Sequence, residues 1–333
     1  MRSFAYSRAS DMDSAIADVS ADPTSEYLAG GTTEVDMLRI GVVRPRRVVD
    51  INDLPIAAIE ELADGGIRLG GLSRMSDVAA HPVVRERYPM VSESLEKGAS
   101  AQLRNMASMG GNLMQKVRCS YFRDGDRACN KRERGSGCAA IEGVNRTHAV
   151  LGTSDYCIAT HPSDVAVALT ALDAVIRLRG PEGERTVAFD DFFLLPGDTP
   201  DLEHPIGHGE LITAIDLPAL PMARTSHYLK VRDRESYEFA LTSAAVALSM
   251  EGDTVTEVRM GLGGAATKPW RARRAEQMLL GATAEPEAFA RAAAAELSDA
   301  VPRSMNGFKI ELAQRTMVRA LTEVASRTRG GTV

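Results

Sequence analysis

The four cysteines of this 333-residue sequence are the residues best suited to metal binding or redox chemistry. They are Cys119, Cys129, Cys138 and Cys157, separated in turn by nine, eight and eighteen residues. Thiolates ligate zinc and iron–sulfur clusters, whereas paired thiols form disulfides in oxidising compartments. The cysteines therefore predict a metal centre, a disulfide pair or a set of unligated thiols.

The spacing of the cysteines favours a metal centre without deciding which one. Disulfides are disfavoured because the N-terminal residues show no export signal. A structural zinc site usually includes two cysteines about two to four residues apart, and no such pair occurs here. A [4Fe–4S] cluster accepts four thiolates from loops with looser spacing. On spacing alone, an iron–sulfur cluster, zinc and unligated cysteines all stay open.

Positive charge surrounds the first three cysteines, although the whole chain is acidic, with 39 Lys+Arg against 45 Asp+Glu. The cations are Arg118, Arg123, Arg127, Lys131, Arg132 and Arg134. Nearby cations lower the pKa of a thiol and stabilise an anionic cluster that thiolates ligate. The same side chains would also suit a solvated loop face or a patch on which a partner docks.

Two Gly-Gly turns are candidates for binding a phosphate-bearing cofactor, which needs close backbone approach and free N–H donors. They are Ala29-Gly30-Gly31-Thr32-Thr33 and Met109-Gly110-Gly111-Asn112. Neither has the G-x-G-x-x-G spacing of a dinucleotide fingerprint, and the chain has no P-loop. Gly261-Leu262-Gly263-Gly264 ends a predicted strand and is interpreted as structural. Because ordinary tight turns have the same composition, these turns alone identify no ligand.

No set of side chains predicts bond-making chemistry on an organic substrate. None of the six histidines is spaced as a metal pair or as part of a Ser/His/Asp triad, and His161 is interpreted as structural. The net charge of -6 and the 5% aromatic content argue against nucleic-acid binding. No apolar run approaches the ~18 residues of a membrane span. The composition is typical of a soluble globular protein.

The hydrophobic pattern predicts two domains that meet near residue 220. Up to that point, predicted strands alternate with short helices, as in α/β regions. The expected strands cover 4–6, 27–29, 48–51, 67–71 and 174–179, and the expected helices begin near Ser10, Glu34, Ser73 and Asp164. Ser73 is expected to cap its helix, and the helix from Asp164 is expected to be buried. Residues 114–158 interrupt the pattern as a long loop. Beyond residue 220 we expect three antiparallel strands (226–232, 243–251, 254–262) and two helices (288–297, 308–324).

Six short motifs follow one another along nearly the whole chain. They are Leu28-Ala29-Gly30-Gly31-Thr32; Gly70-Gly71-Leu72-Ser73; Leu103 to Asn112; Pro162-Ser163-Asp164; Gly209-Glu210-Leu211-Ile212; and Lys230-Val231-Arg232 with Tyr237-Glu238-Phe239-Ala240. In this order they resemble the FAD-binding medium subunits of molybdenum hydroxylases, which include xanthine dehydrogenases, aldehyde oxidoreductases and carbon monoxide dehydrogenases. The resemblance implies an α+β protein: a two-lobed α/β FAD-binding domain of the PCMH type over 1–220, then a smaller domain over 221–330 with a three-stranded antiparallel sheet and helices.

The resemblance also implies which residues hold FAD. The first motif and the residues after it would wrap the pyrophosphate: Leu28, Ala29, Gly30, Gly31, Thr32, Thr33, Glu34 and Val35. Ser108, Gly111 and Asn112 would form a second wall on the phosphate and ribityl side. Asp164 would accept a hydrogen bond from a hydroxyl of the adenosine half. Lys230 would lie near the isoalloxazine, where a cation stabilises the anionic reduced ring.

The inserted loop is similar to a subgroup of these flavin subunits, among them bacterial aldehyde oxidoreductases, that carries an extra [4Fe–4S] cluster. This similarity implies Cys119, Cys129, Cys138 and Cys157 as the cluster ligands. Flavin subunits of 4-hydroxybenzoyl-CoA reductases have such an insertion with other spacings, so that type of complex is an alternative.

The implied function is electron relay without catalysis on the substrate itself. A large subunit with a molybdenum cofactor and a small subunit with [2Fe–2S] clusters would be the partners, and an external acceptor would take the electrons from FAD. A zinc-stabilised scaffold with a vestigial flavin site and a stand-alone flavin oxidase are the other hypotheses. Without an export signal we expect a cytoplasmic protein, or a periplasmic one if a signal-bearing partner carries it across.

Overall fold

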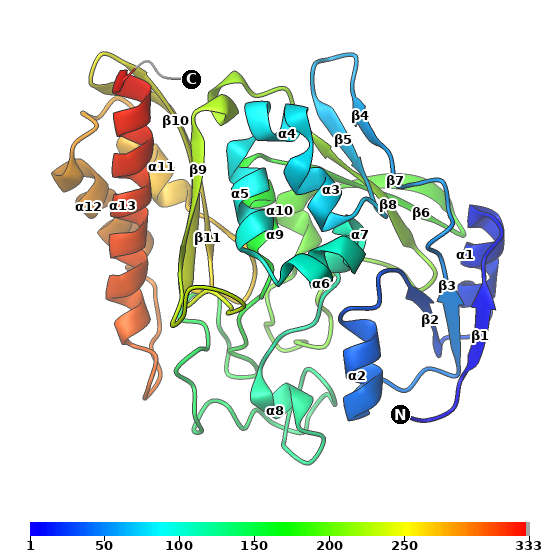
Figure 1. The fold of residues 1–333 in the computed structure, drawn as a ribbon. Coiled ribbons are helices and arrows are strands. Elements are labelled where there is room, and N and C mark those ends of the chain that lie inside the picture. Colours follow the sequence, from blue (N-terminus) through cyan, green and yellow to red (C-terminus); the bar gives the residue numbers. More distant parts are fainter. Residues whose placement is uncertain (331–333) are drawn as a thin grey trace.

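The computed structural model describes residues 1–330, which form three β-sheets with helices around and between them (Figure 1). The first sheet is parallel with the order β1-β3-β2. Its strands are β1 (Ala5–Arg8), β2 (Ser25–Leu28) and β3 (Arg47–Asp50), and its helices are α1 (Met12–Ser20) and α2 (Glu34–Ile40). This lobe confirms the predicted alternation of strands and helices. One detail differs, because Asp11 and not Ser10 caps α1: its carboxylate accepts from the Ser14 N–H at 2.8 Å.

The second sheet has five strands in the order β4-β5-β8-β6-β7, and every neighbouring pair is antiparallel. The strands are β4 (Ile59–Glu61), β5 (Ile67–Gly70), β6 (Val175–Gly180), β7 (Gly183–Ala188) and β8 (Leu211–Leu217). Sequence patterning found β5 and β6 but not the other three. Strand β6 alternates half-buried and buried residues, which matches a sheet with one face on the core.

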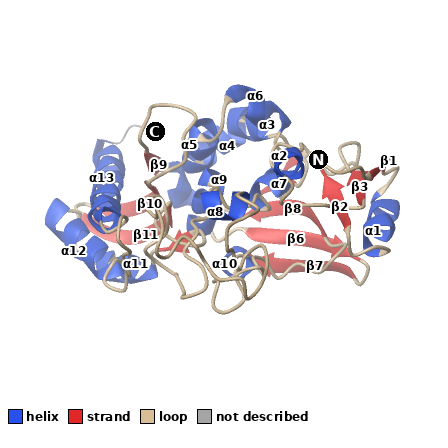
Figure 2. Ribbon diagram, turned by 90° about the horizontal axis from the view of Figure 1, so that it is seen from below, coloured by secondary structure: helices blue, strands red, loops and turns tan. Residues whose placement is uncertain are grey.

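Short helices fill the space between the five-stranded sheet and the C-terminal part of the chain. They are α3 (Met75–Ala80), α4 (Pro82–Arg87), α5 (Pro89–Lys97), α6 (Ala101–Met106), α7 (Met109–Leu113), α9 (Asp164–Ala171) and α10 (Phe189–Phe192). Every residue of α9 is buried, as predicted, and Figure 2 shows this helix between the two sheets. The prediction that Ser73 caps α3 is wrong. Arg74 precedes the helix, and the Ser73 hydroxyl donates to the Ala57 carbonyl at 3.0 Å.

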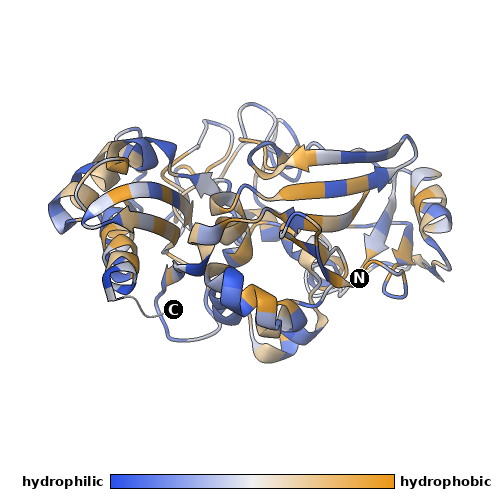
Figure 3. Ribbon diagram, turned by 90° about the horizontal axis from the view of Figure 1, so that it is seen from above, coloured by the Kyte–Doolittle hydropathy of each residue, from blue (hydrophilic) through white to orange (hydrophobic). Residues whose placement is uncertain are grey.

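The C-terminal part contains the predicted antiparallel sheet. Its strands are β9 (Ser226–Val231), β10 (Thr242–Glu251), β11 (Thr254–Gly263) and the additional short β12 (Trp270–Arg271), in the order β12-β11-β10-β9. Helices α11 (Arg273–Leu279), which was not predicted, and α13 (Phe308–Gly330) pack on its strands, and α12 (Pro286–Glu296) packs against both helices. Helix α13 packs against β10 with a mostly apolar buried side, and Figure 3 shows hydrophobic and hydrophilic residues interspersed along the helices.

The two parts of the chain are packed together closely. A 3₁₀ turn (Pro221–Arg224) leads from one to the other. Strands β10 and β11 pack directly on α9, and a Cβ at Gly261 would lie 2.3 Å from the Val167 carbonyl oxygen. This contact explains the glycine at position 261 near the end of β11 and agrees with the structural interpretation of Gly261 to Gly264. The division into domains at residue 220 stays a prediction.

Residues 114–158 form a long loop with one short helix, α8 (Ser120–Arg123), at the bottom of Figure 1. The loop contacts both sides of the molecule. The Val150 N–H donates to the Ala265 carbonyl at 2.8 Å, and Arg123 forms an ion pair with Asp36 of α2. No helix in residues 1–330 is long and apolar enough to cross a membrane.

Candidate cofactor-binding site

A cleft of about 380 Å³ lies between the first lobe and the five-stranded sheet. Both predicted Gly-Gly turns line it, one with residues 29–34 and the other with Ser108, Gly110 and Gly111. The opposite wall is formed by 206–212, which includes the Gly209-Glu210-Leu211-Ile212 motif. The structure therefore brings together segments that are far apart in the sequence.

The first glycine turn is shaped by contacts that exclude any side chain. A Cβ at Gly30 would lie 1.9 Å from the Met106 carbonyl oxygen, and Gly31 has a φ of +70°. Leu28 and Val35 do not line the cleft but flank Gly31: a Cβ there would lie 3.3 and 3.2 Å from their side chains. Only glycine allows the backbone to take this path.

Two side chains, one just after β3 and one just before α3, hold the turn in place. The Asn52 side-chain amide donates to the Ala29 carbonyl at 2.9 Å. Arg74 donates to Asn52 Oδ1 at 2.9 Å and to the Met106 carbonyl at 2.5 Å. The same two side chains thus connect the first turn to the segment that leads to the second.

The first turn has backbone N–H groups close to the cleft, whereas the N–H groups of the second turn (residues 109–112) are already hydrogen-bonded within the protein. The Val35 N–H donates to the Gly31 carbonyl at 3.0 Å, so the amides of residues 32–34 precede the first bond of α2. Ser108, which is buried, caps α7 by accepting from the Gly111 N–H at 3.2 Å. Free N–H groups at a helix start, with no Cβ nearby, are the usual means of binding phosphate.

Glu34 is an acid in the same cleft, and its surroundings favour the protonated form. Burial raises its pKa to about 9, and the neighbouring Glu26 carboxyl adds to the rise, whereas Lys116 opposes it. Its Oε1 atom is buried without a hydrogen-bond partner among the described residues. A protonated Glu34 places no negative charge against an anion bound at the turn.

We expect Glu34→Gln to flatten the pH dependence of the stability of the FAD-free protein. Between the ordinary pKa of 4.5 and about 9, the folded protein binds more protons than the unfolded chain. The free energy of unfolding therefore falls as the pH rises through this range. Chemical denaturation at several pH values between these limits measures the slope, with Glu287→Gln on the exposed side of α12 as the control. An unchanged slope in Glu34→Gln would contradict the raised pKa.

A second cavity, of about 220 Å³, lies between the inserted loop, the start of α9 and the loop that joins β9 to β10. Its lining comes from all three segments: Arg118, Cys119, His148, Ser163, Asp164, Glu238 and Phe239 are among the residues. The predicted site residue Asp164 is thus at this cavity and not in the cleft.

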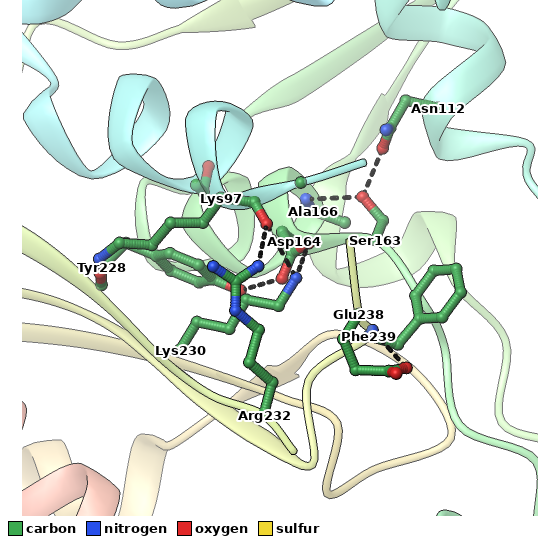
Figure 4. A network of polar contacts seen from close by, with 12 residues as sticks. Lys97, Asn112, Ser163, Asp164, Ala166, Tyr228, Lys230, Arg232, Glu238 and Phe239 are labelled. Atoms are coloured by element: carbon green, nitrogen blue, oxygen red, sulfur yellow. Dashed lines mark hydrogen bonds and ion pairs between the residues drawn. The ribbon is translucent and has the colours of Figure 1, made fainter. Parts of the chain in front are cut away.

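Asp164 and Lys230, both predicted site residues, form a buried ion pair with each other (Figure 4). Lys230 Nζ lies 2.8 Å from Asp164 Oδ2, and its side chain is only 2% exposed. The Tyr228 hydroxyl donates to Asp164 Oδ1 at 2.5 Å. Burial raises the pKa of Asp164, and the Lys230 ammonium group opposes this rise. Tyr228 was missed, although it shares a face of β9 with Lys230 because the two residues are two positions apart.

We expect Lys230→Met to destabilise the protein by about 3–5 kcal/mol, because it leaves the Asp164 carboxylate buried without its cation. The double variant Asp164→Asn/Lys230→Met removes both charges and should recover most of the loss. The free energy of unfolding from urea denaturation measures both. If Lys230→Met were as stable as the wild type, the ion pair would not be needed to hold β9 against α9.

Asn112 lies at the junction of α7 and α9 and lines neither the cleft nor the second cavity. Its Oδ1 accepts from the Ser163 hydroxyl at 2.5 Å, and its side-chain amide contacts the Met75 sulfur at 3.3 Å. Ser163 in turn caps α9 by accepting from the Ala166 N–H at 3.1 Å. The side chain therefore positions two helix starts, and a direct contact with a cofactor stays a prediction.

All four cysteines line one small cavity of about 10 Å³ inside the inserted loop. Cys129 and Cys138 face each other in a short antiparallel bridge, and all four are free thiols. Burial raises the pKa of the Cys119 thiol to about 12 and also raises that of Cys157. No group of three or more His, Cys, Asp or Glu side chains in residues 1–330 is arranged to hold a metal ion.

The cations predicted to surround the cysteines mainly form ion pairs and hydrogen bonds that anchor the inserted loop. Lys131 is next to Cys157, where its charge lowers the pKa of that thiol, and it also pairs with Glu203 at 3.0 Å. Arg134 pairs with Asp201 at 2.8 Å. The remaining cations reach other groups: Arg123 reaches Asp36, Arg127 reaches Asp124, and Arg132 reaches backbone carbonyls. Carboxylates and backbone carbonyls therefore compensate most of the positive charge that the sequence predicted would stabilise thiolates.

Comparison with known proteins agrees with this geometry. Residues 2–220 match the family described as the FAD binding domain in molybdopterin dehydrogenase. The chain belongs to this family. Residues 227–324 match the CO dehydrogenase flavoprotein C-terminal domain. Membership confirms the predicted resemblance to the FAD-binding medium subunits of molybdenum hydroxylases and supports FAD binding.

Relatives of the chain are oxidoreductase subunits. It is 43% identical over 329 residues to the aldehyde oxidoreductase FAD-binding subunit PaoB of Escherichia coli (strain K12), covering 98% of this chain and 100% of that protein. It is 26% identical to the glyceraldehyde dehydrogenase medium chain of Sulfolobus acidocaldarius, covering 84% and 81%. The structure of carbon monoxide dehydrogenase from Hydrogenophaga pseudoflava matches with a TM-score of 0.76 at 24% identity, covering 98% of both chains, and confirms the fold.

Proposed function

We propose that this chain is the FAD- and [4Fe–4S]-carrying subunit of a molybdenum-containing, aldehyde-oxidising complex. It would take electrons from a large molybdenum subunit and a small [2Fe–2S] subunit and pass them through FAD to an external acceptor. The observation that carries the proposal is the cleft that both Gly-Gly turns line, within residues that match an FAD-binding family. Identity of 43% to an aldehyde oxidoreductase subunit favours an aldehyde as the substrate of the complex.

The cleft fits the diphosphate of FAD. The Gly30–Gly31 turn is a cradle that a Cβ would fill, and the amides of residues 32–34, which precede the first bond of α2, would supply the donors. Residues 29–34 with Ser108 and Gly111 would hold the phosphates. Asp164 and Lys230 would support the cavity next to the cleft. When bound, FAD supplies the capacity to collect two electrons and release them to an acceptor.

Within residues 1–330, four thiols and no carboxylate line one cavity of the inserted loop, which is the donor chemistry of a [4Fe–4S] cluster, although the thiols are not positioned around a metal ion in this structure. Cys119, Cys129, Cys138 and Cys157 would be the ligands, and ligation would replace their thiol protons. Lys131 beside Cys157 would offset part of the negative charge of the cluster. Cys119 also lines the second cavity, so the cluster would be next to the flavin site. The cluster supplies one-electron capacity when bound.

Cofactor analysis of the complex tests this proposal. The chain is purified anaerobically with its co-purifying subunits, and extracted flavin, iron, sulfide and zinc are measured per chain. We expect about one FAD and, beyond the iron of the small subunit, about four iron atoms. Zinc without flavin would instead support a stabilised scaffold with a vestigial flavin site. Absence of both iron and flavin from this chain would refute the relay.

A further inference from the structure

Arg118, in the inserted loop, connects the second cavity with the glycine turn that lines the cleft. It lines the second cavity, and its Nη2 donates to Thr33 Oγ1 at 3.2 Å. Thr33 belongs to the glycine turn and lines the cleft. A single side chain of the cysteine loop therefore reaches the segment that, by the proposed function, binds the FAD phosphates.

The charge of Arg118 is only partly compensated in the structure. The nearest carboxylate oxygen is Asp36 Oδ2, 3.8 Å from Arg118 Nη1, and Arg123 contacts the same carboxylate. Two guanidinium groups thus share one acid. The other acids of the second cavity have cations of their own: Asp233 pairs with Arg146 and Glu238 with Arg234.

One of the Arg118 donors has no partner within the described residues. Nη2 is shared between Thr33 and Gln115 Oε1, the latter at 3.4 Å, whereas the Nε atom is buried without an acceptor. The guanidinium also lies 5.2 Å from the centre of the Phe239 ring, which holds it at the cavity wall. A half-buried cation with a buried, unused N–H, beside a residue of the glycine turn, is suited to bind an anion.

We propose that Arg118 binds the diphosphate of FAD, so that the cysteine loop supplies part of the flavin site. This inference rests on the proposed function, and it assigns to the inserted loop a role separate from holding a cluster. The ligand class is a dinucleotide or nucleoside diphosphate. The planar guanidinium would supply charge and donors beside Thr33 of the glycine turn.

The test compares Arg118→Gln with Arg123→Gln in the full-length chain within its complex, after removal of the bound flavin. The control removes the same charge from the same loop, but Arg123 does not line either cavity. FAD and riboflavin, which has no phosphate, are titrated by fluorescence quenching. We expect Arg118→Gln to weaken FAD binding by about 10- to 100-fold, with riboflavin binding and iron content unchanged. Arg123→Gln should leave both affinities near those of the wild type.

Arg118→Lys keeps the charge and should recover a large part of the FAD affinity. Equal loss of FAD and riboflavin binding in Arg118→Gln, or a failure of that variant to fold, would assign Arg118 a structural role and overturn the inference. Unchanged FAD binding would overturn it as well. A wild-type protein that binds no FAD would instead refute the proposed function itself, so the two failures are distinguishable.

Discussion

Replacement of Gly30 by alanine is expected to reduce FAD affinity by about 100-fold or more. The new methyl group would lie 1.9 Å from the Met106 carbonyl oxygen and 3.1 Å from Ala107 Cα. Both of these atoms are backbone, so rotation of a side chain cannot relieve the contact. To relieve the contact, the Gly30–Gly31 turn and the segment before α7 must move apart. Both segments belong to the proposed phosphate site. Fluorescence titration of the FAD-depleted protein measures the affinity.

Gly125→Ala is the matched control for this prediction. It makes the same substitution in the inserted loop, where an added Cβ would meet nothing within 4 Å. We expect its FAD affinity to equal that of the wild type. If Gly30→Ala bound FAD as tightly as Gly125→Ala, the close approach at the turn would not define the cofactor site.

Replacement of Cys138 by serine is expected to remove most of the iron of this chain while FAD stays bound. Serine is a much poorer ligand for iron–sulfur clusters than a thiolate. Cys138 lines the cysteine cavity but neither the cleft nor the second cavity, so its loss leaves the flavin site intact. Iron assay and flavin extraction measure the two contents independently.

Ser136→Ala in the same segment is the control for a local folding defect, because the Ser136 hydroxyl accepts from the Cys129 N–H at 3.0 Å but is not a predicted ligand. Its iron content should stay close to that of the wild type. Full iron content in Cys138→Ser would remove Cys138 from the ligand set. Loss of FAD together with iron would show that the flavin site depends on the cluster loop as a whole.

The parts of the fold that the sequence predicted are those with strong local signals. The strand–helix pattern around Tyr27 and the apolar stripe of α13 depend on residues close together in the chain. Strands β4, β7 and β12 were missed because they are short, or because most of their residues are exposed and lack an apolar period. Ser73 was misassigned because a buried hydroxyl and a helix cap have the same sequence signature.

The candidate site could be predicted only as separate motifs. Composition marked the glycine turns and the cysteines, and the order of the motifs indicated the family. The pairing of Asp164 with Lys230 and the contact of Arg118 with Thr33 join residues from distant segments, which no periodicity reveals. Arg118 was identified as one cation among six, and only the fold distinguishes it from those that bind carboxylates or carbonyls.

The most direct test of the relay is to follow the flavin absorbance when an aldehyde is added anaerobically, first to the complete complex and then to this chain alone. If this chain relays electrons, the flavin will bleach in the complex and recover when an external acceptor is added, whereas the isolated chain will stay oxidised. Flavin that stays oxidised in a complex whose partner subunits are reduced by the aldehyde would contradict this account.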